Sequence, residues 1–194
     1  LHILLNQVET NKQLQLERMT AFTFHQLLNE YRASKKLKTI YWDDKLWLAA
    51  RNHNLYLINC SKHLTHSESA KCHFFTGSQP ENRVHFVTHH SRDFTNPGYE
   101  NCYGNVKADP DFEDLETSYD LSWEEMLKKA KWEAEDAFEA WKSSMGHNMN
   151  MLNTEHLAHG TSFMYGKSED FVVASSVFAQ KQKYYRPDTI KLDF

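Results

Sequence analysis

The two segments nearest the C-terminus that have the character of β-strands follow each other closely. Residues 161–165 and 171–180 combine aromatic and β-branched residues, and the polar residues 166–170 between them are typical of a hairpin loop. A loop this short joins antiparallel neighbours, because parallel strands need a crossover of about a dozen residues or more. The chain is therefore expected to contain a small antiparallel sheet and not a doubly wound parallel one.

Three or four helices are expected before this hairpin, and three of them have clear sequence signals. The first occupies residues 22–34, where apolar side chains recur at helical spacing. The second begins after Asp43 or Asp44, either of which can cap it, and its apolar stripe comprises Leu46, Ala49, Ala50, His53, Leu57 and Cys60. The third begins at Ser122, since Ser122 and Glu125 have the spacing of a capping box. Helices followed by paired strands predict a layered α+β domain.

The composition limits the chain to one folded domain and excludes several classes of function. Its 194 residues, 40% of them hydrophobic, are enough for one core and few for two. With 22 Lys and Arg against 26 Asp and Glu, the formal charge is −4, and nothing indicates a nucleic-acid partner. No apolar run approaches the ~18 residues of a membrane span. The main domain is placed at residues 21–181, after an N-terminal extension (1–20) and before a C-terminal tail (182–194).

The middle of the chain holds most of the unusual residues. Residues 61–105 lack a sustained period and carry many of the 12 histidines, so long ordered loops with short helical turns are expected there. Residues 107–120 are strongly acidic and have the character of a solvated insertion. His53, on the apolar stripe, is expected to be a hydrogen-bonded core histidine. The common phosphate-binding, nucleophile-elbow and zinc-protease motifs are absent from the sequence.

Three short blocks, in order along the chain, are similar to one known family. They are Trp42-Asp43 with Leu64-Thr65-His66-Ser67, then Gly98-Tyr99-Glu100-Asn101, and finally Trp141-Lys142-Ser143-Ser144-Met145-Gly146-His147-Asn148 with Asn150-Met151-Leu152. The second resembles a Gly-Glu-Asn signature with an inserted tyrosine, and the third resembles a bacterial Trp-x-x-Ser-Pro-Gly-His-Arg-x-Asn-x-Leu block. On these blocks the chain is identified as a member of the CAP superfamily of cysteine-rich secretory, antigen five and pathogenesis-related proteins, of the bacterial SCP-like type. The resemblance runs from about Phe22 to Gln180.

This resemblance implies a fold and a location. The fold is a three-layer α-β-α sandwich with a small antiparallel sheet and a central cleft. The location is secreted, extracellular or at the cell surface, and a chain that begins with Leu1 agrees with removal of a signal segment. The implied function is an extracellular binding or interaction module, whose ligand is a protein, peptide or lipid that the sequence does not name.

The resemblance also implies which residues line the cleft. His66 matches the family's first histidine, Glu100 the glutamate of the Gly-Glu-Asn signature, and His147 the second histidine, while Asn101 and Ser144 are expected beside them. Eukaryotic members carry a second glutamate three residues after the tryptophan. In eukaryotic members two histidines and two glutamates line the cleft. Here the position of the second glutamate is Ser144, so the chain lacks one of these four residues.

Three interpretations of these residues stay open on the sequence. His66 and His147 are candidate ligands of zinc or another weakly bound divalent ion, because imidazole nitrogens are common zinc ligands. Glu100 and one histidine are a candidate acid–base pair of a metal-assisted, peptidase-like hydrolase acting on extracellular or cell-wall material. The third interpretation is a hydrogen-bonded polar cluster that holds the loops over the sheet.

Two finer expectations concern the cysteines and one of the histidines. Of the three cysteines, Cys72 and Cys102 flank segments that should converge at the cleft, so a bridge is expected between them and not to Cys60. His147 is expected at a helix C-terminus, where the negative end of the helix dipole favours the protonated ring.

Overall fold

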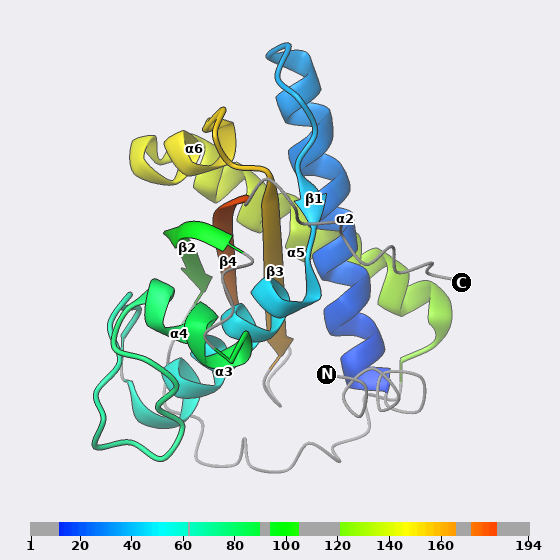
Figure 1. The fold of residues 1–194 in the computed structure, drawn as a ribbon. Helices are drawn as coiled ribbons and strands as arrows, with labels where there is room; N and C mark the ends of the chain where they lie inside the picture. Colours follow the sequence, from blue (N-terminus) through cyan, green and yellow to red (C-terminus); the bar gives the residue numbers. More distant parts are fainter. Residues whose placement is uncertain (1–11, 62, 90–93, 105–120, 166–171, 182–194) are drawn as a thin grey trace.

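Helices lie on both sides of a four-stranded mixed sheet (Figure 1). The structure is a computed structural model that describes residues 12–61, 63–89, 94–104, 121–165 and 172–181. Its elements, in chain order, are α2 (Lys12–Ser34), β1 (Tyr41–Trp42), α3 (Asp44–Cys60), α4 (Pro80–Val87), β2 (Phe94–Gly104), α5 (Trp123–Ser143), α6 (Met145–Leu152), β3 (Ala158–Tyr165) and β4 (Val172–Lys181). The expected hairpin loop 166–170 and acidic segment 107–120 lie outside the described residues.

The sheet is built around the hairpin that the sequence predicts. The strand order is β1-β3-β4-β2, and β3 pairs with β4 in antiparallel register from Ala158↔Ala179 to Tyr165↔Val172. β2 pairs with β4 in antiparallel fashion, whereas the two-residue β1 pairs with β3 in parallel. β2 therefore forms one edge of the sheet.

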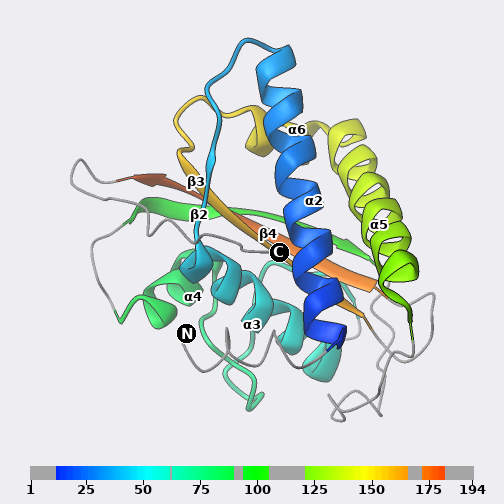
Figure 2. The ribbon, with the colours of Figure 1, turned by 90° about the vertical axis from the view of Figure 1, so that its right-hand side faces the viewer.

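The helices form a layer on each face of the sheet. In Figure 2, α2, α5 and α6 lie on one face, and α3 and α4 lie on the other. The larger core, between the sheet and the helices α2 and α5, includes Phe24, Phe138, Trp141, Phe163 and Phe178. Smaller clusters under α3 and α4 fill the other face. The expected α-β-α sandwich is confirmed.

Gly160 on β3 sets how closely α3 approaches the sheet. A Cβ atom added at Gly160 would lie 1.9 Å from the backbone nitrogen of Trp47, which is closer than two atoms can pack. Because glycine has no side chain, the first turns of α3 rest directly on β3. Further along α3, His53 contacts Glu68 and Thr65 of the loop that follows the helix.

The helix starts agree with the capping signals in the sequence, with one difference. The Asp43 side chain accepts hydrogen bonds from Lys45 N and Leu46 N, and Ser122 and Glu125 form the expected capping box. α2, however, begins at Lys12 and not near Phe22. The buried face of this helix continues through Leu14, Leu16 and Met19, which explains the longer helix.

The strand β2 corrects the expectation of continuous loops in residues 61–105. Pro97 and Gly98 indicated a loop, but the chain forms an 11-residue strand whose register shifts between Thr95 and Tyr99. Asn96, inside this irregularity, has a φ of 46°. Proline has no backbone N–H to donate, and an edge strand tolerates it because no described strand pairs with its outer side.

The disulfide joins Cys60 and Cys72, so the expected bridge from Cys72 to Cys102 is wrong. Cys60 is the last residue of α3, and the following loop returns so that the Cα atoms of Cys60 and Cys72 lie 6.2 Å apart. Cys102 is a buried free thiol in β2. The bridge therefore ties the loop after α3 to the end of that helix, while a thiol remains inside the domain.

We predict that the Cys60→Ser/Cys72→Ser double variant keeps the fold and loses about 3 kcal/mol of unfolding free energy, since the bridge closes a loop of 12 residues' separation. Urea unfolding followed by circular dichroism measures this loss. Addition of a reductant should bring the wild type down to the variant. An unchanged midpoint for the double variant would contradict the prediction.

A chain of neutral polar groups crosses the larger core. Asn29 Nδ2 donates to His25 Nε2 (3.3 Å), and His25 Nδ1 lies 2.7 Å from His159 Nε2. His159 Nδ1 in turn lies 3.2 Å from the hydroxyl of Thr161, which is 2.7 Å from that of Ser176. Burial lowers the pKa of His25 to about 4 and lowers that of His159 well below its usual value. Both rings are therefore neutral near pH 7.

We predict that acid destabilises the wild type more than a His25→Gln variant. The folded pKa of His25 lies below the value of about 6.5 in the unfolded chain, so between these values the unfolded chain binds more protons and stability falls as the pH falls. From pH 7 to about 4.5 the additional loss should be roughly 2 kcal/mol. Urea unfolding at both pH values measures it, and titrating groups away from the contact between His25 and His159 cancel between the two proteins. Equal losses would contradict the prediction.

Candidate functional site

Glu100 is the central charged group of the candidate site. It lies on β2, and its carboxylate is almost fully buried, with 1% of the side chain exposed. Arg83 Nη2, from α4, donates to Glu100 Oε2 at 2.6 Å, and His66 Nδ1, from the loop after α3, donates to Oε1 at 3.0 Å. Both carboxylate oxygens therefore have partners from two other segments.

A second buried carboxylate, Glu68, completes this group. Glu68 Oε2 accepts hydrogen bonds from the backbone N–H groups of Thr76 (2.8 Å) and Gly77 (3.3 Å). Glu68 Oε1 lies 2.9 Å from His53 Nδ1 and 3.6 Å from Arg83 Nε. Arg83 thus lies between two carboxylates, one in the loop and one in the sheet.

The surroundings of Glu100 keep it ionised. Burial alone would raise its pKa, but the positive charges of His53 and Arg83 and the hydrogen bonds from His66 and Arg83 lower it to about 2. A carboxylate with so low a pKa has little tendency to take up or release a proton near neutral pH.

Cys102 lies on the same face of β2 as Glu100, because side chains two residues apart on a strand point the same way. Its Sγ is 3.5 Å from Glu100 Oε1 and 3.6 Å from both His66 Nδ1 and Ser175 Oγ. Burial, together with the nearby charge of Glu100, raises the pKa of the Cys102 thiol well above its usual value. The thiol form is therefore strongly favoured in the structure described here.

His147 lies in the first turn of α6 and not at a helix C-terminus, which corrects the expectation that its protonated form is favoured. Partial burial and the neighbouring charge of His66 lower its pKa. The positive end of the α6 dipole acts in the same direction. The backbone oxygen of His147 accepts from Asn101 Nδ2 (3.1 Å), and Asn101 Oδ1 accepts from Asn150 Nδ2 (2.9 Å).

Ser144 joins the two helices beside the site. It is the N-cap residue of α6, yet its side chain makes no capping hydrogen bond. Trp141, three residues earlier on α5, donates from Nε1 to the backbone oxygen of Cys102 at 3.0 Å. The tryptophan of the third sequence block therefore fixes α5 to the edge strand, next to the thiol.

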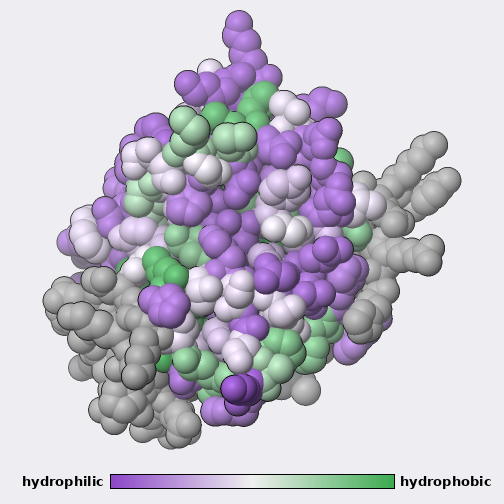
Figure 3. Space-filling view, turned by 90° about the vertical axis from the view of Figure 1, so that its left-hand side faces the viewer, coloured by the Kyte–Doolittle hydropathy of each residue, from purple (hydrophilic) through white to green (hydrophobic). Residues whose placement is uncertain are grey.

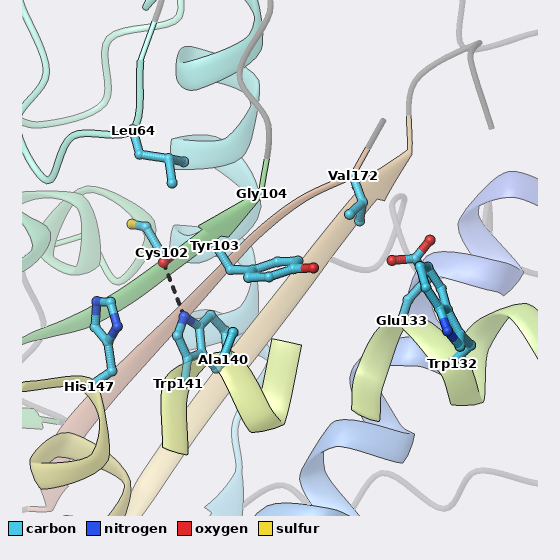
Figure 4. A pocket seen from close by; sticks show the side chains of 10 residues that line it. All are labelled: Leu64, Cys102, Tyr103, Gly104, Trp132, Glu133, Ala140, Trp141, His147 and Val172. Carbon is cyan, nitrogen blue, oxygen red and sulfur yellow. Dashed lines mark hydrogen bonds between the residues drawn. The ribbon is translucent and has the colours of Figure 1, made fainter. Parts of the chain in front are cut away.

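A pocket of about 560 Å³ opens beside these residues. Figure 4 shows Cys102 and His147 at one end, Trp132 and Glu133 at the other, and Tyr103 with Trp141 between them. Leu64 and Val172 complete its apolar part. A volume of this size is typical of ligand-binding sites.

The described residues around the edge strand form no broad apolar face. Figure 3 views the side of the molecule on which α6, β2 and α4 lie in Figure 1, and hydrophobic residues form small patches there between hydrophilic ones. The side chains of Trp132 (62% exposed), Met145 (82%) and Met149 (67%) are nevertheless open to solvent. Trp132, which also lines the pocket, is therefore accessible from solvent.

The structure brings together part of the predicted set of residues and adds three others. His66 and Glu100 are in hydrogen-bond contact, and Asn101 holds the backbone of His147. Sequence reasoning did not identify Glu68 or Arg83, and it placed Cys102 near the cleft only as a partner in a disulfide. That Cys102 and Glu100, two residues apart, point to the same face becomes visible only once residues 94–104 are recognised as a strand. Arg83, a single arginine on a short helix, offers no such signal.

One set of described side chains has the spacing of metal ligands. One ligand atom each of His53, Glu100 and Cys102 lies within 4.8 Å of the other two, a separation that a metal ion bridges. His53, however, uses both nitrogens: Nδ1 faces Glu68 Oε1 (2.9 Å) and Nε2 faces the backbone oxygen of Thr65 (2.7 Å). Both nitrogens of His53 are thus already engaged in short contacts, and a metal ion would have to displace one of them. Glu100 and Cys102 are the donors that remain.

Comparison with known families identifies the chain. The model of the CAP, or cysteine-rich secretory protein, family matches residues 25–178, which is most of the chain. The chain therefore belongs to this family, as its three sequence blocks predict. The comparison with curated proteins finds no match.

Two solved structures share the fold. An outer surface protein from Borrelia burgdorferi is 15% identical, with a TM-score of 0.55, over 81% of this chain and 90% of that one. An extracellular protein containing an SCP domain, from Bacillus anthracis, is 18% identical, with a TM-score of 0.59, over 88% of this chain. The present chain spans 43% of the length of the latter. Among the described helices, none is long and apolar enough to cross a bilayer.

We predict that Arg83→Met costs about 3 to 5 kcal/mol of unfolding free energy, because Glu68 and Glu100 would remain buried without their shared cation. Urea unfolding measures the loss. Lys128→Met is a matched control, since its pair with Glu124 is exposed and should contribute less than about 1 kcal/mol. Similar losses in the two variants would show that the buried group does not hold the domain together.

Proposed function

We propose that this CAP domain is an extracellular binding module that takes an apolar side chain of a peptide segment into the pocket beside His147. The observation that carries the proposal is the composition of that pocket. Leu64, Tyr103, Trp132, Trp141 and Val172 supply apolar surface, and His147 and Cys102 supply polar atoms at one end. Ligand sites typically combine apolar walls with a few polar groups that orient the ligand.

The charge of the pocket favours a peptide over an anionic lipid. Among the described residues that line it, none is lysine or arginine, and Glu133 contributes a carboxylate. A fatty-acid carboxylate or a lipid phosphate would find no cationic partner on those walls. An uncharged or basic peptide segment meets no such penalty.

An extracellular location is supported from two sides. The Cys60–Cys72 disulfide is the kind of bond that persists in oxidising compartments. Proteins with this fold are described as an outer surface protein and as an extracellular protein. A surface role agrees with a function that depends on binding.

A hydrolase has less support than a binding module. Glu100 is paired with Arg83 and has a pKa of about 2, which makes it a weak base for activating water. Cys102 has a raised pKa, whereas a nucleophilic cysteine requires a thiolate. The metal-assisted alternative therefore depends on His66 and His147. Their position in the cleft is equally compatible with a role in binding.

Trp132 gives the sharpest test. We predict that peptides selected from a displayed random library on the wild type bind Trp132→Ala on the order of tenfold more weakly, since exposed aromatic side chains dominate such interfaces. The matched control is Trp123→Ala, because Trp123 is an exposed tryptophan of the same helix that does not line the pocket. Fluorescence anisotropy of labelled peptides measures both affinities.

Two outcomes would contradict the proposal. One is an equal loss of affinity in the Trp132→Ala and Trp123→Ala variants, which would place binding outside the pocket. The other is a library that yields no binder while laurate binds the wild type and not Trp132→Ala. That second result would identify the pocket as a lipid site.

A further inference from the structure

We propose that His66 Nδ1, Glu100 Oε1 and Cys102 Sγ form a binding site for a thiophilic divalent cation such as zinc. The family resemblance implied a pair of histidines, His66 and His147, as metal ligands. The proposed site differs because a cysteine and a glutamate of the edge strand β2 take part. It does not depend on the peptide ligand proposed for the pocket.

The distances among the three donor atoms carry this inference. Nδ1 of His66 lies 3.0 Å from Glu100 Oε1 and 3.6 Å from Cys102 Sγ, and Sγ lies 3.5 Å from Oε1. Around a tetrahedral zinc ion, with N, O and S ligands about 2.0 to 2.3 Å from the metal, the corresponding edges are about 3.3 to 3.6 Å. The three atoms therefore already form one face of such a tetrahedron to within a few tenths of an ångström.

The chemistry of the donors also fits. Arg83 holds Oε2 of Glu100 and leaves Oε1 as a single oxygen ligand whose orientation is fixed, as outer partners of metal ligands commonly do. Imidazole, carboxylate and thiolate are all ligands that zinc accepts. His66 keeps its second nitrogen, and 50% of its side chain is exposed, so the cation has a route from solvent.

The local charge makes the thiolate necessary. His53 and Arg83 both lie against Glu100 and place positive charge close to the site. A divalent ion held only by neutral imidazole and this shared carboxylate would meet that charge without compensation. Ionised Cys102 supplies the additional negative charge: the metal–sulfur bond replaces the S–H bond, and the proton passes to solvent. On His66, the cation takes Nδ1 and the ring proton moves to the second nitrogen.

Cobalt(II) alone, added to the full chain without reductant, tests the site. Wild-type protein should bind one ion and develop the near-ultraviolet charge-transfer absorption of a thiolate–cobalt bond, which zinc then abolishes. Cys60 and Cys72 do not contribute, since they are joined in the disulfide. Cys102→Ser should lack the absorption and bind at least about tenfold more weakly, and His66→Ala should bind weakly as well.

The matched control is His147→Ala, which should keep the absorption. Cobalt bound by the wild type without a thiolate band would overturn the proposal, as would unchanged affinity in Cys102→Ser. Loss of binding in His147→Ala with full binding in Cys102→Ser would assign the metal to the two histidines instead. Should Cys102→Ser fail to fold, the wild-type spectrum and the exposed His66→Ala variant still decide the outcome. Trp132→Ala should bind cobalt normally, so failure of the metal site and failure of the peptide pocket are separate results.

Discussion

Arg83 connects the parts of the molecule that carry the candidate site. Its guanidinium binds Glu100 of the edge strand and lies against Glu68 of the loop, and Nη1 also donates to the backbone oxygen of His66 at 3.2 Å. The loop after α3 thereby takes its position from a charge on α4 and a charge on β2. Because Glu68 and Arg83 are both buried, a loop that moved away would break their ion pair and the hydrogen bond between His66 and Glu100. His66 is consequently held at the sheet although half of its side chain is in solvent.

The edge position of β2 explains why the site forms there. No described strand pairs with its outer side, and unpaired backbone groups at an edge invite unwanted pairing. Side chains cover this edge instead: Trp141 donates to the backbone oxygen of Cys102, and Asn150 lies 3.4 Å from that of Glu100. Covering the edge brings α5 and α6 to one side of β2, while the loop with His66 reaches it from the other. The pocket lies where the two helices and this loop meet the strand.

The sequence allowed the helices, the hairpin and the family blocks to be predicted, because each depends on local signals. The capping box at Ser122 and the stripe along α3 need no tertiary information. β2 could not be predicted in this way, since its register is set by pairing with β4 across about 75 residues and its Pro97 resembles a loop residue. The wrong prediction of a disulfide between Cys72 and Cys102 followed from the failure to predict β2. The neighbours of Cys102 depend on which face of the strand its side chain occupies. The sequence pattern assigns Cys60 to the buried stripe of the helix, although it is the last residue of that helix.

The departure at Ser144 acquires a physical meaning beside Cys102. In eukaryotic relatives a glutamate at that position would add a negative charge to the cleft, and here a neutral serine stands there. Cys102 can supply a comparable charge, since its Sγ is 3.6 Å from His66 Nδ1 and its ionised form is also an anion. The exchange of a carboxylate for a thiolate changes the cation that is preferred, because sulfur ligands favour zinc and disfavour magnesium or calcium. Ser144 begins α6, and Trp141, three residues earlier on α5, donates to the backbone oxygen of Cys102, so the segment that carries the serine is fixed to the strand that carries the thiol.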